Sequence, residues 1–360
     1  MARSKGQVRN VTLAEIARAC GLSTPVVSLV LRSKTSGSIR YSQETAARVQ
    51  AMAKELGYRP NRASRGHFGG RHDSIGLLVD RFFDLSSLAL QAIHTEAAAQ
   101  GWLLVVERHA VSDQVIPTLV REHAVDGLLL PNDVSPEVAE RILELGIPAV
   151  WINTNRTTGS GVLTYDEAGG MALAVGHLKQ TGRRRILHIH QPRDAHYSSA
   201  ARLSGLRAAC AAAALPVPNV GTLDRRPDAI GVPAPEQVVA RLVDLLHLHA
   251  DCDSVVTHTA TAPYVYTAAR RVGRDIPRDL GVVGIGGGDL THLLDPPLTT
   301  IAVGQWDVGY KAVHALADIL EGKDVGMAEL PYTLHPARST ESDISSTASI
   351  PATIRSSDHE

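Results

Sequence analysis

At 360 residues the chain is longer than one ordinary domain, and we expect two or three domains. Its 44% hydrophobic and 20% charged residues are typical of a soluble globular protein, and no apolar run approaches the roughly 18 residues of a membrane helix. The first ten residues lack the apolar stretch of a secretory signal. Three widely spaced cysteines, Cys20, Cys210 and Cys252, favour a reducing cytoplasm and are expected to be small buried side chains.

The charge is divided unevenly along the chain. Residues 1–72 hold 13 Lys and Arg against three Glu, a net charge of +10, whereas the remainder holds 23 basic and 34 acidic residues, a net charge of −11. A basic head on an acidic body is typical of a nucleic-acid-binding module attached to a domain with another role. A charged run can also be no more than a solvated face, so the motifs inside the head decide its interpretation.

A first helix is predicted at the start of the basic segment. Thr12 and Glu15 have the spacing of a capping box, in which each residue satisfies a backbone N–H of the other. The helix is expected to run to about Cys20. Gly21 can adopt the left-handed conformation that ends it.

Two further helices complete the head. Ser23 or Thr24 can cap a second helix with Pro25 in its first turn, where a missing N–H costs nothing, and this helix reaches about Leu31. A third helix is expected over residues 42–56. Two short helices across a tight glycine-bearing turn, supported by a third, predict a helix-turn-helix, and the alternative is a generic three-helix bundle.

The head resembles that of the lactose/galactose-repressor family of transcriptional regulators. The resemblance is carried, in order and at the right spacing, by residues 11–23, Val27-Ser28-x-Val30-Leu31, Glu44-Thr45 and residues 55–61. It implies a DNA-binding domain over residues 1–60 whose second helix enters the major groove. The residues that we expect to contact DNA are Thr12, Ser23, Thr24, Pro25, Val26, Ser28, Leu29, Arg32, Tyr58, Asn61, Arg62, Arg65, His67 and Phe68.

The second helix departs from the family pattern. Leu29 stands where the family often has an arginine, and it cannot make the bidentate contact with guanine. Base readout is then expected from Thr24, Val26 and Ser28, through thymine methyl groups, with Arg32 nearby. The loop 34–40 is longer than usual and is expected to lie on the phosphates.

Residues 61–72 resemble the hinge helix that pairs with its dimer mate in the minor groove in this family. His67 stands where a leucine normally wedges between base steps, and Phe68 is the nearby side chain that can act as an apolar wedge. Gly66, Gly69 and Gly70 disfavour helix, so the segment is expected to be disordered without DNA. The alternative is a flexible Gly/Arg-rich linker that contacts phosphates.

The remaining chain alternates strand and helix patterns, which predicts an α/β fold with doubly wound parallel sheets. There are too many units for one ordinary sheet, so we expect two lobes with ligands at the carboxyl ends of the strands. The predicted strands are 75–79, 103–106, 127–130, 149–152, 186–189, 254–257 and 282–285, with a last strand near 332–335. The predicted helices are 87–100, 112–123, 136–145, 167–181, 197–214, 235–249 and 263–272.

The family resemblance continues more loosely over residues 73–338. Its landmarks include Ile75–Val79, Val125–Leu130, Arg202–Gly205 and Asp295–Thr300. It implies an effector-binding and dimerisation core similar to periplasmic sugar-binding proteins, with two lobes joined by three crossings. The crossings are expected near residues 153–164, 286–300 and 325–335.

The resemblance also implies which residues bind an effector. Arg202 matches the arginine that grips effector hydroxyls or carboxylates, a role that suits its fork of donors. Residues 257–261 replace an Asn-Asp pair, and Gly284–Gly288 replaces a segment with a carboxylate used on sugars, for which Asp289 is a substitute. The expected effector-binding residues are Arg202, Asp166, His190, Gln191, His258 and Asp289, and each also has a plain surface or structural interpretation.

Enzyme and metal motifs are incomplete in this sequence. The glycines at 284–288 do not form a dinucleotide-binding Gly-x-Gly-x-x-Gly because Asp289 takes the place of the last glycine. His188 and His190 would share one face of a strand, but no further ligands are spaced to join them. We therefore expect no enzyme, no cofactor and no metal site.

The sequence thus predicts a cytoplasmic homodimeric regulator, by default a repressor, that binds a pseudo-palindromic DNA operator. A small-molecule effector, a carbohydrate or related metabolite, is expected in the cleft of the core, with no membrane partner. One alternative is a regulator whose core only dimerises, and another is an enzyme on the same core. The polar, Ser-rich residues 339–360 are expected to be a disordered tail without a tetramerisation heptad.

Overall fold

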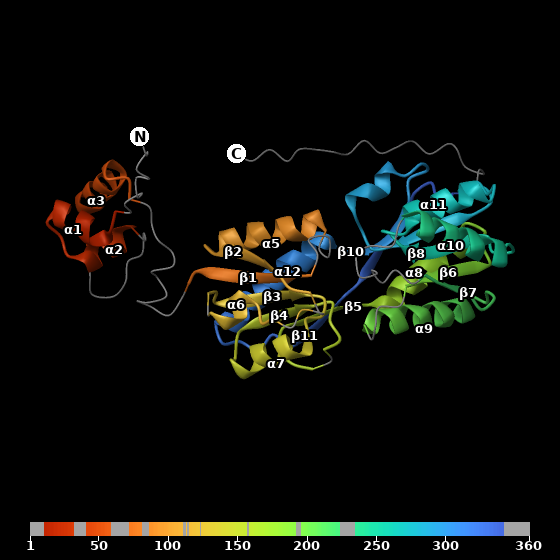
Figure 1. Cartoon of the computed structure of the whole chain (residues 1–360), viewed down its shortest axis with the longest axis horizontal. Helices are drawn as coiled ribbons and strands as arrows, with labels where there is room; N and C mark the ends of the chain where they lie inside the picture. The colour runs from red at the N-terminus through yellow and green to blue at the C-terminus, as the bar shows by residue number, and fades with distance from the viewer. Residues whose placement is uncertain are drawn as a thin grey trace, which may run out of the picture. The chain divides into compact units, whose positions relative to one another are not determined.

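A computed structural model describes residues 11–31, 41–58, 72–80, 86–110, 113, 115–122, 124–156, 158–191, 196–223 and 235–341. The chain divides into two compact units, Met1–His72 and Asp73–Glu360. Figure 1 colours them from red at the amino end to blue at the carboxyl end.

The first unit contains three helices, α1 (Leu13–Cys20), α2 (Thr24–Leu31) and α3 (Gln43–Glu55). The predicted capping box starts α1, since the Thr12 N–H donates to Glu15 Oε2 at 2.8 Å and the Glu15 N–H donates to Thr12 Oγ1 at 3.3 Å. Gly21 ends α1 in the left-handed region, with φ 64°. Apolar side chains from the three helices form one cluster, centred on Ile16, Val27, Val30, Val49 and Ala53.

The second unit contains two six-stranded sheets. The first sheet has the order β11-β5-β4-β3-β1-β2 and is parallel throughout. Its strands are β1 (Ser74–Val79), β2 (Leu103–Arg108), β3 (Gly127–Pro131), β4 (Ala149–Ile152), β5 (Val162–Tyr165) and β11 (Met327–Leu330). The buried β-branched and leucine side chains of β1, β3 and β4 are typical of a parallel sheet covered on both faces.

The second sheet has the order β12-β10-β9-β8-β6-β7. It is parallel except for β12, which pairs antiparallel with β10. Its strands are β6 (Ile186–His190), β7 (Asn219–Thr222), β8 (Ser254–His258), β9 (Gly281–Ile285), β10 (Thr299–Val303) and β12 (Tyr332–His335). The two-lobed, mainly parallel α/β core is therefore confirmed.

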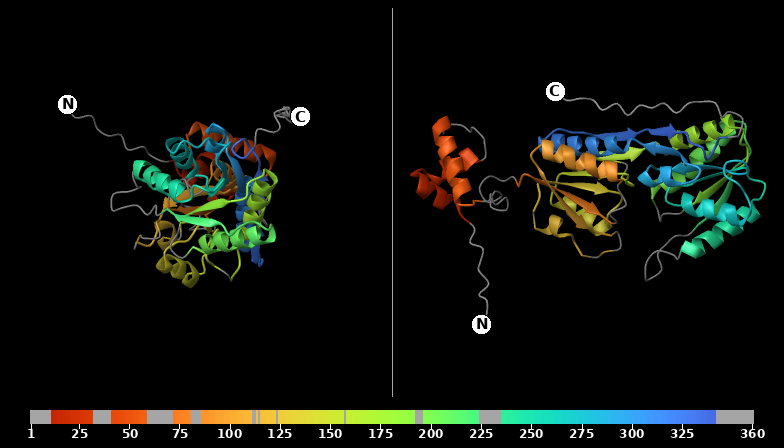
Figure 2. Two further views of the ribbon diagram at one scale, coloured as in Figure 1. Left: turned by 90° about the vertical axis from the view of Figure 1, so that its right-hand side faces the viewer. Right: turned by 90° about the horizontal axis from the view of Figure 1, so that it is seen from above.

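Helices cover the sheets in pairs. On the first sheet α5 (Ser87–Ala99) packs on α12 (Gln305–Leu320), as Figure 2 shows on the right, and α6 (Thr118–Arg121) packs on α7 (Pro136–Glu144). On the second sheet the pairs are α8 (Glu167–Gln180) with α9 (Tyr197–Ala212) and α10 (Pro235–Leu248) with α11 (Ala262–Arg271). A short 3-10 helix, η2 (Asp289–Leu293), follows β9. Gly309 allows α5 and α12 to pack closely. A Cβ at this position would lie 2.5 Å from the Ala89 carbonyl oxygen, so a larger residue would push the helices apart.

The three crossings between the lobes follow β5, β10 and β11, and two of them differ from the prediction. The first comes after Tyr165, just beyond the predicted 153–164, because β5 still belongs to the first sheet. The second lies between β10 and α12, so the predicted 286–300 is wrong: η2 and β10 both remain with the second lobe. The third, at Pro331, falls inside the predicted 325–335.

Other elements also differ from the sequence prediction. The strands β5, β7, β10 and β11 and the long helix α12 were not predicted. Within the described part of 112–123, the helix is limited to α6, which has four residues. Pro117 precedes it, and the segment before Pro117 is not helical where it is described.

The carboxyl end of the core extends past the predicted boundary at residue 338. Ser339 and Thr340 are fully buried, so the prediction of a disordered tail is wrong for these residues. The Ser339 hydroxyl donates to the Val282 carbonyl at 2.6 Å, and Thr340 Oγ1 lies 2.7 Å from both His177 Nε2 and Thr299 Oγ1. These bonds tie the segment to β9, α8 and β10. The rest of the predicted tail, 342–360, lies outside the described residues.

The three cysteines are free and buried, as predicted. Within the described ranges no single helix has the length and apolar character to span a membrane, although α1 and α2, bent by 106°, meet those criteria when joined.

Candidate functional site

The first candidate surface is the outward side of α2. Val27 and Val30 are buried in the cluster of the first unit, so α2 turns its other side away from that cluster. On that side Thr24 and Pro25 are exposed, and Ser28 and Leu29 are partly exposed. All four were predicted from the sequence to contact DNA.

The other predicted DNA-binding residues are distributed as follows. Thr12 and Ser23 are exposed at the starts of α1 and α2, and Val26 is partly exposed. Tyr58 packs against the apolar cluster, and its N–H donates to the Ala53 carbonyl at 2.8 Å. The remaining residues lie outside the described part of the chain: Arg32, Asn61, Arg62, Arg65, His67 and Phe68, with the loop 34–40 and most of the predicted hinge.

The second candidate site is built around Arg202, on α9. Its guanidinium donates to both carboxylate oxygens of Glu167, from Nε to Oε2 at 2.7 Å and from Nη2 to Oε1 at 2.9 Å. The Tyr332 hydroxyl donates to the same Oε2 at 3.0 Å. Glu167 follows the first crossing and Tyr332 follows the third, so Arg202 is bound at the point where two crossings enter the second lobe.

Burial and charge shape the ionisation of this group. Burial alone would lower the pKa of the Arg202 guanidinium, but Tyr332 and Glu167 raise it, so the arginine stays charged. Burial also raises the pKa of Tyr332, which stays a neutral donor. With the Glu167 side chain 1% exposed and that of Arg202 18% exposed, the pair is a buried, mutually neutralised ion pair.

The structure brings His190 toward Arg202. Burial lowers the pKa of His190, and the charge of Arg202 lowers it further. The neighbouring Gln191 donates from Nε2 to the Thr261 hydroxyl at the start of α11. These two predicted effector-binding residues therefore lie at the carboxyl end of β6.

The remaining predicted effector-binding residues are less closely grouped. Asp166 caps α8, since its Oδ1 accepts the Gly169 N–H at 2.8 Å. His258 is exposed, and its Nδ1 accepts the Ala260 N–H at 3.2 Å. Asp289 starts η2, but its side chain is outside the described part of the chain.

A polar network that the sequence analysis missed joins the two lobes next to Arg202. The His196 ring, at the start of α9, donates from Nε2 to the Asn153 carbonyl at 2.9 Å, because its Nδ1 accepts the Ser198 N–H. The Tyr197 hydroxyl donates to Asn153 Oδ1 at 3.0 Å and accepts the Tyr165 N–H at 3.0 Å.

Three more contacts extend this network at the carboxyl ends of β3 and β4. The Tyr197 N–H donates to Asn155 Oδ1 at 2.6 Å. The Asp133 carboxylate accepts the Asn155 N–H at 3.0 Å and lies 3.9 Å from His196 Nε2. We call His196, Tyr197, Asn153, Asn155 and Asp133 the lobe junction.

One signal in the sequence could have predicted three of the five residues of the lobe junction. Asn132-Asp133 and Asn153-Thr154-Asn155 follow buried strands directly, at the edge where parallel strands place ligand-binding groups. The partners His196 and Tyr197 carry no such signal. Nor does Tyr332, whose contact with Glu167 spans 165 residues of sequence.

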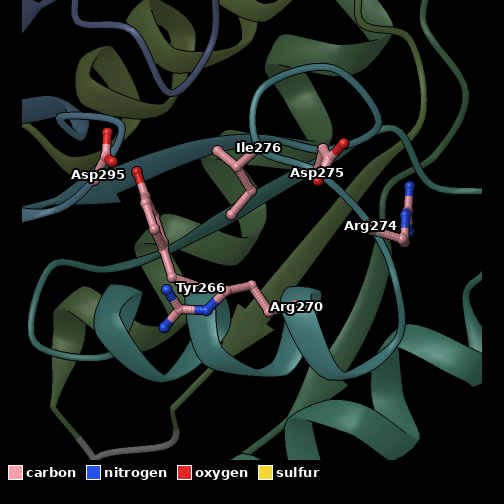
Figure 3. A pocket seen from close by; sticks show the side chains of 6 residues that line it. All are labelled: Tyr266, Arg270, Arg274, Asp275, Ile276 and Asp295. Atoms are coloured by element: carbon pink, nitrogen blue, oxygen red, sulfur yellow. The ribbon is translucent and has the colours of Figure 1, made fainter.

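A pocket of about 260 Å³ lies elsewhere in the second lobe. Tyr266, Arg270, Arg274, Asp275, Ile276 and Asp295 line it, as Figure 3 shows. It is formed by α11 and by the segments that precede β9 and β10. It contains none of the six predicted effector-binding residues, so it is not the site that the sequence analysis describes.

Of the two histidines on β6, His188 is explained by packing. His188 is buried, and its Nδ1 lies 3.2 Å from the Val256 carbonyl oxygen on the neighbouring strand. Burial lowers the pKa of His188 to about 4, so the ring is neutral. Across the described residues no group of three or more His, Cys, Asp or Glu is arranged to hold a metal ion.

Comparison with known proteins matches both units of the chain to known domains. The model for bacterial regulatory proteins of the lacI family matches residues 12–61, and a periplasmic binding protein-like domain matches residues 175–340. The transcriptional repressor CytR of Escherichia coli strain K12 is 29% identical over 361 residues, covering 90% of this chain and 94% of CytR. The chain therefore combines a lacI-type helix-turn-helix domain with a periplasmic binding protein-like domain, and its relatives of similar length are LacI-family regulators.

Other LacI-family proteins match over a similar length. The regulator CelR of Thermobifida fusca is 27% identical and covers 91% of this chain and 97% of its own. A lac repressor dimer bound to operator and the anti-inducer ONPF has the same fold, with a TM-score of 0.76 at 22% identity over 93% of this chain and all of that one. A CelR–cellobiose complex gives a TM-score of 0.62 at 24% identity, covering 92% and 100% of the two chains. This chain therefore shares the lac repressor fold and carries the DNA-binding helix-turn-helix of the LacI-family transcriptional regulators.

Proposed function

We propose that this regulator is a cytoplasmic homodimeric repressor whose DNA binding is controlled by a small uncharged or weakly charged metabolite, such as a carbohydrate. Its division is DNA-binding domain 1–60, hinge 61–72 and effector-binding core from 73. We infer that it has no enzymatic activity. The observation that carries the proposal is the position of Arg202 and the lobe junction, where two crossings and the carboxyl ends of strands from both lobes meet.

The effector is proposed to bind beside Arg202, His190 and Gln191. Two of the guanidinium nitrogens of Arg202 are already bonded to Glu167, and Glu167 cancels the charge of the arginine. A neutral polar ligand is accommodated there more easily than an anion. The cellobiose in the CelR complex and the ribose bound to a LacI-family regulator of Enterococcus faecium support this chemistry.

The dimer is proposed to place two copies of α2 about 34–36 Å apart, one turn of DNA. The lac repressor dimer on its operator supports this arrangement. An effector that binds one arrangement of the lobes better than the other would shift the population toward it and so change DNA affinity. The three free, buried cysteines support a reducing cytoplasm.

The test begins with selection of bound sequences from random duplex DNA by the full-length protein. We expect a pseudo-palindromic site whose affinity falls steeply as salt rises. Pooled sugars and related metabolites are then screened for a rise in Tm and a change in affinity for that site. Arg202→Ala should abolish the response, and Arg207→Ala, an exposed arginine on the same helix, should retain it.

The same screen tests the alternative regulator, in which the core only dimerises. That reading would be favoured if a specific DNA site were recovered but no metabolite changed either Tm or affinity.

A further inference from the structure

The recognition helix α2 has no side chain that can make a bidentate hydrogen bond with a base. Its eight residues are Thr, Pro, Val, Val, Ser, Leu, Val and Leu. Guanine is typically read by Arg or Lys, and adenine by Asn or Gln, each through two hydrogen bonds in the major groove. Readout by α2 is therefore limited to hydroxyl groups and apolar surface.

The apolar surface has a defined place on the helix. Pro25 and Leu29 are four residues apart and so lie on one side, opposite the buried Val27 and Val30. Among the described residues, neither Pro25 nor Leu29 belongs to the apolar cluster of the first unit or packs against it. The hydroxyls of Thr24 and Ser28 flank the pair. We call Pro25 and Leu29 the apolar strip.

The chemistry of the major groove indicates which group of DNA contacts the apolar strip. In the major groove the thymine C5-methyl group is an apolar feature that distinguishes one base from the others, whereas phosphates and the other base edges are polar. Placing Leu29 against a methyl group removes apolar surface from water, and placing it against a polar edge leaves that edge without a hydrogen bond.

We propose that the apolar strip packs on thymine methyl groups, so that α2 reads its half-site mainly through the positions of thymines. This inference rests on the proposed DNA-binding function and adds the readout chemistry to it. The sequence alone assigned the thymine contacts to Thr24, Val26 and Ser28, whereas the apolar strip assigns them to Pro25 and Leu29.

The test uses the site selected by the full-length protein. Each thymine of the half-site is replaced in turn by deoxyuridine, which removes the methyl group and keeps every hydrogen-bonding atom. One or two positions should each lose about fourfold in affinity, the value of one buried methyl group. Deoxyuridine in the flanking DNA should change nothing.

A variant links the effect to the strip. Leu29→Ala should weaken binding to the thymine duplex and remove most of the deoxyuridine effect at one position. Leu56→Ala, which truncates an exposed leucine at the end of α3, should change neither. The deoxyuridine series on the unmodified protein needs no variant to fold.

The outcomes separate the two proposals. If a specific site is recovered but deoxyuridine has no effect at any position, or Leu29→Ala retains the full deoxyuridine effect, the thymine readout is overturned and the DNA-binding function stands. If no sequence is enriched at any salt concentration, the DNA-binding function is overturned together with the inference built on it.

Discussion

The outward side of α2 and the lobe junction use their side chains in opposite ways. On α2 the exposed or partly exposed groups are two hydroxyls, a proline, a valine and a leucine, and those side chains are not part of the packed cluster of the head. At the junction, polar side chains from both lobes bond to one another, and Arg202 bonds to Glu167. A partner of α2 therefore meets an open surface, whereas a ligand at the junction has to compete with bonds that already exist.

Under the proposed function, this difference lets α2 keep one DNA-binding surface while an effector alters the lobe junction. The face of α2 is held by the buried side of the same helix and can stay the same with or without a partner. A ligand that breaks or replaces a junction bond changes what holds the lobes together. Differential binding of this kind is what shifts a two-state equilibrium.

The largest loss of stability is expected when the buried Glu167–Arg202 ion pair of the core is broken. Glu167→Ala leaves a buried guanidinium without its counter-charge, and we expect the core to lose about 3–5 kcal/mol of unfolding free energy. Denaturant unfolding of the full-length protein measures this loss. Arg207→Ala should stay within about 0.5 kcal/mol of the natural protein. A loss below about 1 kcal/mol for Glu167→Ala would show that the pair does not hold the crossings.

The head and the core should also differ in how their stability responds to acid. Burial lowers the pKa of His188 to about 4, whereas an unfolded histidine titrates near 6.5. As the pH falls from 6.5 toward 4, the unfolded core therefore gains a proton that the folded core does not, and this histidine alone should cost about 3 kcal/mol of stability. Residues 1–66 contain no histidine, so the head has no such contribution.

The check is the unfolding free energy of the core at several pH values. His188→Gln should flatten the dependence between pH 6.5 and 4 by about the amount stated. His247→Gln, at an exposed position, should leave it unchanged. Equal slopes in the natural protein and His188→Gln would contradict the assignment.

Within the head, a substitution on the buried side of α2 should lower stability, and one on the outward side should weaken DNA binding. Val27→Ala removes a fully buried side chain and should destabilise the head by about 2 kcal/mol. Leu29→Ala should change stability by less than about 0.5 kcal/mol while weakening DNA binding. Thermal unfolding and DNA titration of the same two proteins distinguish the sides. Comparable destabilisation by both variants would mean that Leu29 belongs to the core of the head.

The smallest effect is expected at Tyr197, whose hydroxyl bridges Asn153 and the Tyr165 backbone N–H. Tyr197→Phe should cost about 1–2 kcal/mol, because both partners lose a hydrogen bond. It should also alter the effector concentration needed to change DNA affinity, since the bond joins the lobes. Tyr310→Phe, on an exposed side chain, is the control. An unchanged effector response would limit Tyr197 to a role in stability.

Local chemistry made the head predictable. The Thr12–Glu15 capping box, Gly21 and Pro25 act within a few residues of one another, so the ends of α1 and α2 could be placed before any fold was known. In the core, strands with buried aliphatic runs, such as β1 and β3, were equally clear. The short strand β11 was not, because three of its four residues are exposed and its position depends on pairing with β5, which lies more than 160 residues away.

The same limit applies to the candidate sites. Arg202 could be proposed from its resemblance to the family, but its partner Glu167 could not, because only the packing of α8 on α9 brings them together. The helix α12 was not predicted, although its regular apolar spacing at Val308, Ala312 and Leu316 could have indicated a helix. Its place on the first sheet, next to α5, follows only from the crossing after β10.

That crossing has a consequence for the order in which the protein is made on the ribosome. The head is encoded by one continuous stretch, so its helices can pack as soon as residue 58 has emerged. The first sheet cannot receive its edge strand β11 until residue 330 has been synthesised, and the second sheet waits for β12. Because domains fold as units during synthesis, both lobes should be completed nearly together and late. A chain whose translation stops between these points would carry a folded DNA-binding head without a complete core to control it.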